Sequence, residues 1–468
     1  MDEFFNSKEF KEKLAKYEEA RQQGLSVFLD SDDMADIAEY YHMQHRDDEA
    51  LDVCDRAIAM FPHSLRPLVF RARFELIIHK DPDKAESWME QIEDTDDLDY
   101  YYLYAEILLV RGKYKDAETY LEDAYDHLDD EDDRADFVLD VALLMCDYYR
   151  MDEAQHWLSL SDEPDQADYQ EAKGRIALYR GHYEESEKIF NRLLDQDPYS
   201  APYWNTLATS QFLRNDVHDS IESSEYSIAI NPNDDEALLN KANGLFTLGN
   251  YKEALKYYER YTDVGNHALG TAFQAVVLMA LKQYPKARRM LEDSIAEMTD
   301  DDENLYEVER QLCLCLSSMK LTDEAQHWAD RMFSLKNIER WQVYVFKGYL
   351  HLLASSFSEA QLCFNQAVYC GDSLSLVVIS ISMALHDCEL YDYSYCIHNY
   401  ILQTTNEELN MGFAYLADDC LHLNEIDDYK KYLRIACSRC PDEVGYVFAD
   451  QIPDNVRPED YWKIVCNK

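Results

Sequence analysis

Two adjacent stretches, APYWNTLATSQFLRNDVHDSIESSEYSIAINP (201–232) and DEALLNKANGLFTLGNYKEALKYYERYTDVGN (235–266), decide the fold because they are two copies of one pattern. Each copy contains an apolar-periodic helix, a short polar turn and a second helix. Ala208 in the first copy matches Ala242 in the second, and Ser220 matches Ala254 in the same way. Self-similarity at a fixed period indicates a repeat protein, and both small positions recur along the chain.

The small position in the second helix recurs ten times after Ala50, with Tyr429 in the last place, and the mean spacing is about 34 residues. Where packed helices approach within about 8–10 Å, a large side chain would push them apart, and alanine is small and the best helix former. The sequence therefore predicts an all-α solenoid of about twelve helix pairs. The second-helix positions are Ala50, Ala85, Ala117, Ala154, Ser186, Ser220, Ala254, Ala287, Ala325, Ala360, Ser394 and Tyr429. The first-helix positions are Ala38, Arg73, Ala105, Ala142, Gly174, Ala208, Ala242, Ala275, Cys313, Gly348, Ser382 and Ala417, of which only Arg73 is not small.

This pattern resembles the tetratricopeptide repeat family, whose repeats carry a Trp, a Leu, small residues and a closing Pro at set positions. The best copy matches at Trp204, Leu207, Ala208, Ser220, Ser227 and Pro232. The first copy matches at Ile37, Ala38, Tyr41, Ala50, Ala57 and Pro62, and the last at Phe413, Leu416, Ala417, Leu433, Ala436 and Pro441. The resemblance covers residues 31–441 and implies a right-handed superhelix of antiparallel helix pairs, with more than one turn.

The positions of the repeats divide the chain into three expected segments. We expect an N-terminal capping helix region in residues 1–30, a tetratricopeptide-like repeat array in 31–444 and a C-terminal capping segment in 445–468. The ends of a solenoid need such caps because the terminal repeats would otherwise expose an apolar face. The longest repeat intervals contain acidic runs at 126–136 and 296–305, which we expect to be loops between pairs.

The charge balance narrows the classes of partner. The chain has 93 Asp and Glu against 44 Lys and Arg, a formal net charge of −49. Such a field repels phosphates, so we expect no nucleic-acid binding and no binding to anionic membranes. A basic or largely apolar protein segment is the expected partner, although the charge also serves solubility.

The twelve cysteines and the N-terminus indicate the cytoplasm. Cys54, Cys146 and Cys363 fall singly in helical patterns, where a free cysteine behaves as a small apolar residue. The N-terminus has no apolar signal core, and no stretch approaches the roughly 18 apolar residues of a membrane span.

No motif indicates catalysis. The sequence has no phosphate-binding G-x-x-x-x-G-K-[ST] or G-x-G-x-x-G, no G-x-S-x-G and no H-E-x-x-H. Cys437 and Cys440 form a lone C-x-x-C, which we interpret as packing. His386, Asp387 and Cys388 are consecutive, and consecutive residues on a helix point in different directions. We expect no enzyme activity, no metal site and no cofactor.

The family resemblance implies that the first helix of each pair lines a concave groove. By register, the groove of repeats five to seven contains amides, aromatics and one arginine, a set that suits an extended peptide. The alternative is that Phe212, Leu239 and Phe246 pack between helices instead, and the sequence leaves both open. The predicted groove residues are Glu171, Arg175, Tyr179, Asn205, Thr209, Phe212, Leu239, Asn243 and Phe246.

One subclass of the family is disfavoured. Family members that clamp the C-terminal carboxylate of chaperones use basic groove residues beside asparagines. Asn205 and Asn243 fit the amide roles here, but Leu269 and Phe273 occupy the basic positions. The leading hypothesis is a non-catalytic scaffold that binds a protein segment in its groove. The alternative is a self-associating structural protein, and an enzyme is the weakest reading.

Overall fold

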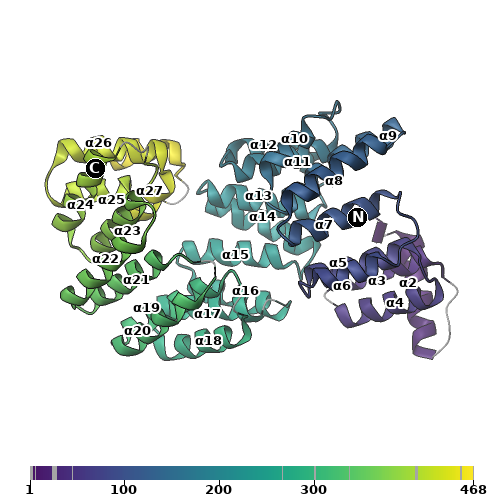
Figure 1. The fold of residues 1–468 in the computed structure, drawn as a ribbon, viewed down its shortest axis with the longest axis horizontal. Helices are drawn as coiled ribbons and strands as arrows, with labels where there is room; N and C mark the ends of the chain where they lie inside the picture. Colours follow the sequence, from purple (N-terminus) through teal and green to yellow (C-terminus); the bar gives the residue numbers. More distant parts are fainter. Residues whose placement is uncertain are drawn as a thin grey trace. The chain divides into compact units, whose positions relative to one another are not determined.

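The structure is a computed structural model of an all-helical chain (Figure 1). It describes residues 4–5, 7–23, 29–44, 46–265, 267–299, 302–336, 338–405, 409–453 and 456–466.

Within the described residues, twelve helix pairs follow one another from residue 31 to residue 439, as the repeat spacing predicts. Successive helices are antiparallel, so the fold is a helix-pair solenoid. The pairs are α3 (Ser31–Met43) with α4 (Asp47–Met60), α5 (Leu65–Ile77) with α6 (Pro82–Met89), α7 (Leu98–Val110) with α8 (Tyr114–His127), α9 (Glu131–Asp147) with α10 (Met151–Leu158), α11 (Ala167–Tyr179) with α12 (Tyr183–Gln196), α13 (Ala201–Leu213) with α14 (Val217–Ile230), α15 (Asp235–Thr247) with α16 (Tyr251–Asp263), α17 (His267–Ala280) with α18 (Tyr284–Glu297), α19 (Leu305–Ser318) with α20 (Thr322–Arg331), α21 (Arg340–Leu353) with α22 (Phe357–Cys370), α23 (Leu374–Asp387) with α24 (Tyr391–Thr404), and α25 (Phe413–His422) with α26 (Ile426–Arg439).

The turn inside each of the last ten pairs has the same backbone conformation. One residue with positive φ follows the first helix, and the next N–H bonds to a carbonyl five residues back, as from Lys113 to Leu108 at 2.9 Å. This is the Schellman ending of a helix, which satisfies terminal carbonyls. Glycine takes the positive-φ position in three pairs, and other residues take it in seven. The positions are Gly112, Tyr149, Gly181, Asn215, Gly249, Lys282, Lys320, Ser355, Glu389 and Asn424.

The recurring small positions are the close contacts between helices. All twelve second-helix positions are buried, and in the first helices every position is buried except Arg73. Two positions are glycine because a phenylalanine of the paired helix fills the space. A Cβ on Gly174 would lie 2.7 Å from Phe190, and one on Gly348 would lie 2.3 Å from Phe364. The spacing of small residues is thus explained by packing.

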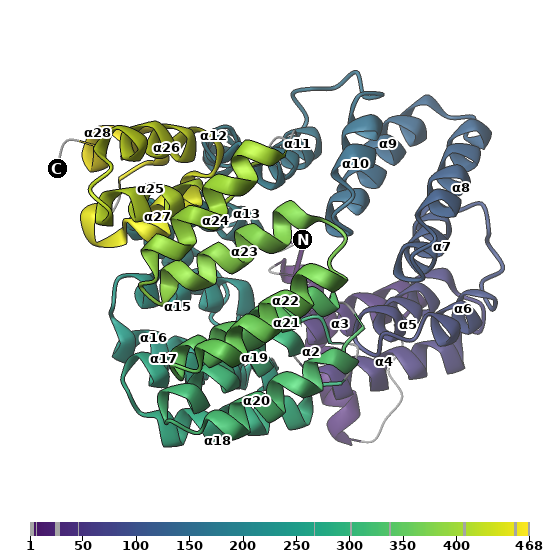
Figure 2. The same ribbon diagram turned by 60° about the vertical axis from the view of Figure 1, so that its left-hand side comes forward.

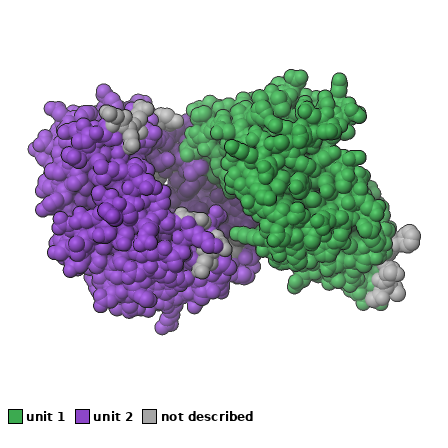
Figure 3. Space-filling model, viewed as in Figure 1, with its two compact units in different colours: residues 1–210, 229–232 green, residues 211–228, 233–468 purple. Residues whose placement is uncertain are grey.

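The chain forms two compact units, and the division falls in the sixth pair (Figure 3). Unit 1 comprises residues 1–210 and 229–232, and unit 2 comprises 211–228 and 233–468. The interior of this pair is rich in serine. Ser220, Ser224 and Ser227 are buried, and the Ser223 hydroxyl donates to Gln211 at 2.7 Å. Buried hydroxyls must be hydrogen-bonded to avoid a penalty, so this interior differs from the apolar clusters of the other pairs.

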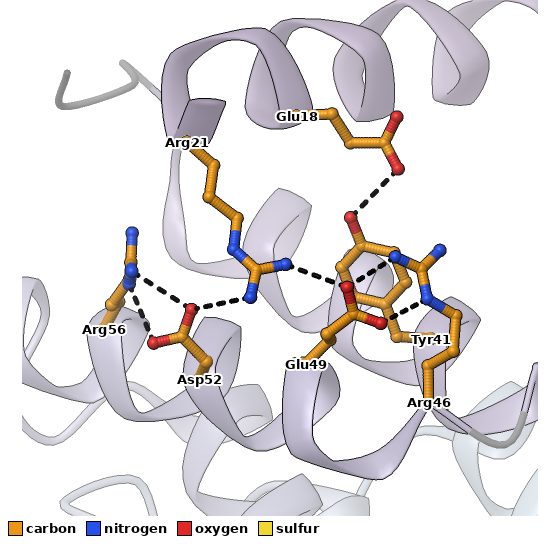
Figure 4. A network of polar contacts seen from close by, with 7 residues as sticks. All are labelled: Glu18, Arg21, Tyr41, Arg46, Glu49, Asp52 and Arg56. Atoms are coloured by element: carbon orange, nitrogen blue, oxygen red, sulfur yellow. Dashed lines mark hydrogen bonds and ion pairs between the residues drawn. The ribbon is translucent and has the colours of Figure 1, made fainter. Parts of the chain in front are cut away.

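The N-terminal helix α2 (Lys8–Gln23) docks on the first pair through ion pairs (Figure 4). Arg21 contacts Glu49 at 3.1 Å and Asp52 at 3.6 Å, and the Tyr41 hydroxyl donates to Glu18 at 3.2 Å. Arg46 also pairs with Glu49. Residues 24–28 of the predicted N-terminal capping region lie outside the described residues. We call Glu18, Arg21, Tyr41, Arg46, Glu49, Asp52 and Arg56 the cap network.

At the other end, α27 (Pro441–Val447) and α28 (Tyr461–Val465) pack on α26, and the 3₁₀ turns Ala449–Gln451 and Pro458–Asp460 lie between them in the sequence. A further 3₁₀ turn, Met332–Ser334, follows α20. Phe448 and Tyr461 are buried in the last apolar cluster, whereas Tyr446 is exposed. Within unit 2, the Asn215 amide donates to the Val456 carbonyl at 3.0 Å. The C-terminal segment therefore returns to the turn of the sixth pair. The bounds of the three predicted segments stay predictions.

The acidic run at 126–136 is not mainly a loop. Asp130 caps α9 by accepting from the N–H groups of Asp132 and Asp133, and Glu131 begins the helix. Carboxylates are favourable at a helix N-terminus because they interact with its partial positive charge. Part of the run at 296–305 lies outside the described residues.

Candidate protein-binding surface

The first helices of unit 1 lie side by side, since α3 packs on α5, α5 on α7, and α9 on α11 (Figure 1). Charged side chains link each of these helices to the next. Arg66 on α5 contacts Asp36 at 2.7 Å and Glu39 at 3.3 Å, both on α3. The first helices thus carry a polar surface that continues from pair to pair.

Arg73 extends this surface from α5 to α7. Its guanidinium lies 3.1 Å from the buried Glu106 carboxylate and 3.8 Å from Asp99. Arg73 is also the residue that breaks the small-residue pattern. The exception therefore has a physical role, because the arginine supplies the counter-charge for a carboxylate that the neighbouring helix buries.

Two tyrosines and one arginine continue the surface from α7 to α13. The Tyr102 hydroxyl donates to Asp140 at 2.8 Å, and Arg175 pairs with Asp147 and, at 3.7 Å, with Glu171. On α13, the neighbouring Tyr203 hydroxyl partly opposes the rise in the pKa of Glu171. We call the carboxylates and arginines of this surface the acidic ladder: Asp36, Glu39, Asp99, Glu106, Asp140, Asp147, Asp168 and Glu171, with Arg66, Arg73 and Arg175.

Carboxylates outnumber arginines in the acidic ladder, and the carboxyl pKa values reflect this. Burial raises the pKa of Glu106 in spite of the Arg73 charge, and Asp147 and Asp99 raise it further. The pKa values of Glu39 and Glu171 are raised in the same way, by burial first and then by neighbouring carboxylates. A raised carboxyl pKa means that the ionised form is disfavoured, so an added positive charge would be stabilised here.

The structure places the predicted groove residues of unit 1 in different surroundings. Glu171 and Arg175 belong to the acidic ladder. Tyr179 is exposed and its ring meets Tyr149 edge to face at 5.1 Å. Asn205 is buried and Thr209 is half-buried on α13. Only some of the predicted residues therefore offer side chains to solvent.

The remaining predicted residues lie in unit 2. Asn243 accepts a hydrogen bond from the Tyr258 hydroxyl at 2.7 Å. Leu239 and Phe246 are partly buried against the apolar cluster around Ala242 and Tyr258, which fits the alternative that they pack between helices. Phe212 is half-buried. Ligand contact by any of the nine residues stays a prediction.

Register reasoning could have found more of the acidic ladder. Arg175, Thr209 and Asn243 each follow the small position of the first helix. The same step from Ala38 and Ala105 leads to Glu39 and Glu106, two carboxylates that the sequence analysis did not select. The pairing of Arg73 with Glu106 depends on the packing of α5 on α7 and is visible only in the structure.

The other candidates have structural explanations. His386 contacts Asp419 at 2.8 Å, and the Ser394 hydroxyl donates to the same carboxylate at 2.5 Å. Cys437 and Cys440 pack in the last apolar cluster. All twelve cysteines lie in the described part of the chain and are free. No helix in the described ranges is both long and apolar enough to cross a membrane, and those ranges hold no group of three or more potential metal ligands.

The repeated pairs, the shared turn conformation and the buried small positions together define the type of solenoid. The chain has the helix-pair fold of tetratricopeptide repeat proteins. No protein-family model and no curated protein sequence matches the chain.

Solved tetratricopeptide repeat proteins are similar in structure to parts of this chain. One from Parabacteroides merdae is 17% identical, with a TM-score of 0.42 over 54% of this chain and 98% of its own. TTC0263 from Thermus thermophilus is 11% identical, with a TM-score of 0.34 over 38% and 97%. YrrB, described as having an unusual peptide-binding site, is 16% identical, with a TM-score of 0.30 over 40% and 95%.

Proposed function

We propose that this protein is a non-catalytic scaffold that binds a basic segment of another protein along the acidic ladder of unit 1. The observation that carries the proposal is the excess of partly buried carboxylates over arginines in the ladder. Burial and neighbouring carboxylates raise the pKa values of Glu106 and Glu171 in spite of the arginines beside them. Arginine and lysine side chains of a ligand would supply further positive charge.

Access to the ladder supports the same proposal. Asp140, Asp147 and Asp168 are exposed, so a ligand can reach them, while Glu106 and Glu171 lie deeper. Tyr102 adds a ring beside Asp140, and aromatic rings favour guanidinium groups. The predicted residues Glu171, Arg175 and Tyr179 would then contact the segment, with Asn205 and Thr209 as neighbours on α13. Nearly all of the described chain consists of repeat pairs, which supports a scaffold without catalysis, and we propose that it acts in the cytoplasm.

The test is the binding of a short arginine-rich peptide, with a glutamate-rich peptide of equal length as the negative control. Fluorescence anisotropy would measure the affinity of the full-length protein at low and high salt. We expect binding of the arginine-rich peptide alone, and weaker binding at high salt because ions screen the exposed charges. Binding of both peptides, or of neither, would contradict the proposal.

A pair of variants with equal charge change locates the site. One removes the exposed ladder carboxylates by Asp140→Asn, Asp147→Asn and Asp168→Asn. The control removes three exposed carboxylates of second helices by Glu122→Gln, Asp123→Asn and Asp195→Asn. We expect the ladder variant to bind on the order of tenfold more weakly and the control to change little, since exposed pairs contribute roughly 0.5–1 kcal/mol each. Equal losses in both would indicate attraction by net charge only.

A further inference from the structure

The outer positions of the second helices can be compared in the same register. Counted from the buried small residue, the outer positions lie at −1, +2, +6 and +9. In α12 and α16 all of these positions are charged, as expected for surface helices of an acidic protein. They are Glu185, Lys188, Arg192 and Asp195 in α12, and Glu253, Lys256, Arg260 and Asp263 in α16.

Two helices of unit 2, α22 and α24, depart furthest from this pattern (Figure 2). Their eight outer positions include a single charge, on Glu359. The apolar side chains among them are highly exposed: Leu362 at 65%, Tyr369 at 87%, Tyr393 at 67% and Tyr400 at 63%. We call these eight positions the uncharged stripe: Glu359, Leu362, Gln366 and Tyr369 in α22, and Tyr393, Cys396, Tyr400 and Gln403 in α24.

Packing of the chain itself does not explain the uncharged stripe. The core of these pairs is formed by other residues of the same helices, with Ala360 and Phe364 of α22 buried and Ile397 of α24 packed against their cluster. Phe357 and Val368 add further exposed apolar surface to α22. Groups of exposed apolar residues with few charges and several tyrosines are typical of protein–protein interfaces.

We propose that the uncharged stripe of α22 and α24 binds the same stripe on a second copy of this chain. Charge favours this occupant. Each copy carries a net charge of −49, so two copies repel each other over most of their surfaces. The stripe is a face on which two acidic chains can meet with only one carboxylate, Glu359, on each side. A basic partner would gain little there, because only one of the eight positions offers a carboxylate.

The composition of the stripe also fits a symmetric contact. A twofold interface brings the same patch of both copies together, so the patch must complement itself. Tyrosine, leucine and glutamine can do so, because tyrosine and glutamine both donate and accept hydrogen bonds while leucine packs against rings. Charged stripes such as that of α16 would need an exact antiparallel match of signs.

The salt dependence separates this proposal from the binding of a basic segment. Salt screens the repulsion between two acidic copies, so self-association should strengthen as the salt concentration rises. Binding of a basic peptide to the acidic ladder should weaken under the same conditions. The two proposals can therefore fail independently, since either effect can be present without the other.

The test is sedimentation velocity of the full chain over a wide range of concentration, at low and high salt. We expect a reversible monomer–dimer equilibrium that shifts towards the dimer at high salt. The first variant, Leu362→Lys with Tyr369→Asp, introduces the residues that α12 and α16 have at these positions and leaves the net charge unchanged. The second variant, Tyr393→Glu with Tyr400→Arg, introduces on α24 the Glu and Arg that α12 and α16 have at the equivalent positions, again with no change in net charge.

Each variant should weaken dimerisation by on the order of tenfold or more, because buried aromatic anchors dominate interfaces. The matched control is Leu160→Lys with Tyr199→Asp, which changes exposed apolar residues of unit 1. The control should dimerise like the unmodified protein, and thermal melts would confirm that all variants fold. A monomer under every condition, or a dimer that neither stripe variant weakens, would overturn the proposal.

Discussion

At the N-terminal end of unit 1, Glu49 lies between two arginines, whereas two pairs further along Glu106 shares Arg73 with Asp99. Hydrogen bonds from Arg46 and Arg21 lower the pKa of Glu49 to about 2. In Glu106, burial and neighbouring carboxylates raise the carboxyl pKa instead. Both sites use the same residue types, with Glu49 on the second helix α4 and Glu106 on the first helix α7.

The two sites differ in the number of arginines for each carboxylate and in how deeply the carboxylates are buried. The cap network has three arginines for three carboxylates; Glu49 and Asp52 each contact two arginines, and Glu18 accepts a hydrogen bond from Tyr41. The acidic ladder has fewer arginines than carboxylates and is more buried at Glu106 and Glu171. Satisfied charges hold the cap in place, while unsatisfied ones leave the ladder able to gain free energy from a cationic ligand.

The largest effect on stability should come from Arg73→Ala. This change leaves the buried Glu106 carboxylate without its counter-charge, and breaking such a pair costs about 3–5 kcal/mol. Chemical denaturation at neutral pH would measure the free energy of unfolding. Alanine is the residue that other pairs have at this position, so the backbone should accept it.

The double variant Arg73→Ala with Glu106→Leu is the control for this prediction. Leucine stands at the equivalent position in the fourth and ninth pairs, as Leu143 and Leu314. The double variant should recover most of the lost stability, because an apolar pair can replace a buried ion pair at little cost. A double variant as unstable as the single one would show that Arg73 acts through packing and not through charge.

His398 gives the comparison a third case, a buried group in unit 2 that carries no counter-charge. Burial lowers the pKa of His398 to about 4. Its Nδ1 lies 3.2 Å from the Ser382 hydroxyl, and its Nε2 has no hydrogen-bond partner among the described residues. Equivalent positions hold Phe190, Phe364 and Leu433. We expect His398→Leu to stabilise the protein by about 1–3 kcal/mol, the usual cost of an unsatisfied buried polar group.

Thermal melts at pH 7 and pH 5 would test the His398 prediction. An unfolded histidine binds a proton below its ordinary pKa of 6.5, while the folded His398 does so only near 4. The contribution of this residue to stability is therefore highest above pH 6.5 and falls as the pH approaches 4. The leucine variant should lose less stability between pH 7 and pH 5 than the unmodified protein. An equal loss would contradict the assignment.

Lowering the pH should remove a stabilising contribution from the cap network and a destabilising one from the acidic ladder. The pKa of Glu49 is about 2 in the folded chain against 4.5 ordinarily, so its contribution is complete above pH 4.5 and is lost as the pH falls towards 2. The raised pKa of Glu106 means that ionisation opposes folding at neutral pH, and this cost disappears as the pH falls below the raised pKa.

Hydrogen exchange read by mass spectrometry, corrected for the intrinsic pH dependence, would resolve the two regions. Between neutral pH and pH 3, protection of α2 and α4 should decrease relative to that of α5 and α7. The peptide affinity of the ladder should fall over the same range, because protonated carboxyls no longer attract arginine. Parallel changes in both regions would contradict the proposed difference in charge balance.

Much of this fold could be predicted from the sequence, because the cause is local and repeated. Small residues recur at nearly every close contact between paired helices, and the series from Ala50 to Tyr429 predicts the pairs and their turns. The acidic ladder was only partly predictable. Glu171 and Arg175 follow from the register, but the partner of Arg73 depends on how α5 packs on α7. The run at 126–136 was misread because charge alone does not separate a loop from a helix N-terminus.

The smallest expected effect belongs to Arg21→Ala in the cap network. Arg21 is about one-third exposed, and surface ion pairs contribute roughly 0–1 kcal/mol. We therefore expect global unfolding to change by no more than about 1 kcal/mol. Protection of α2 from hydrogen exchange should nevertheless fall, since Arg21 links that helix to both Glu49 and Asp52.

The matched control for Arg21→Ala is Arg56→Ala, which leaves the contact between α2 and Glu49 intact and removes only a pair with Asp52 on its own helix. That variant should leave the exchange of α2 close to that of the unmodified protein. Peptide binding should be unchanged in both variants, because the cap charges are already satisfied. A loss of peptide affinity in Arg21→Ala similar to that of the ladder variant would place the cap network in the binding surface and end the distinction between the two regions.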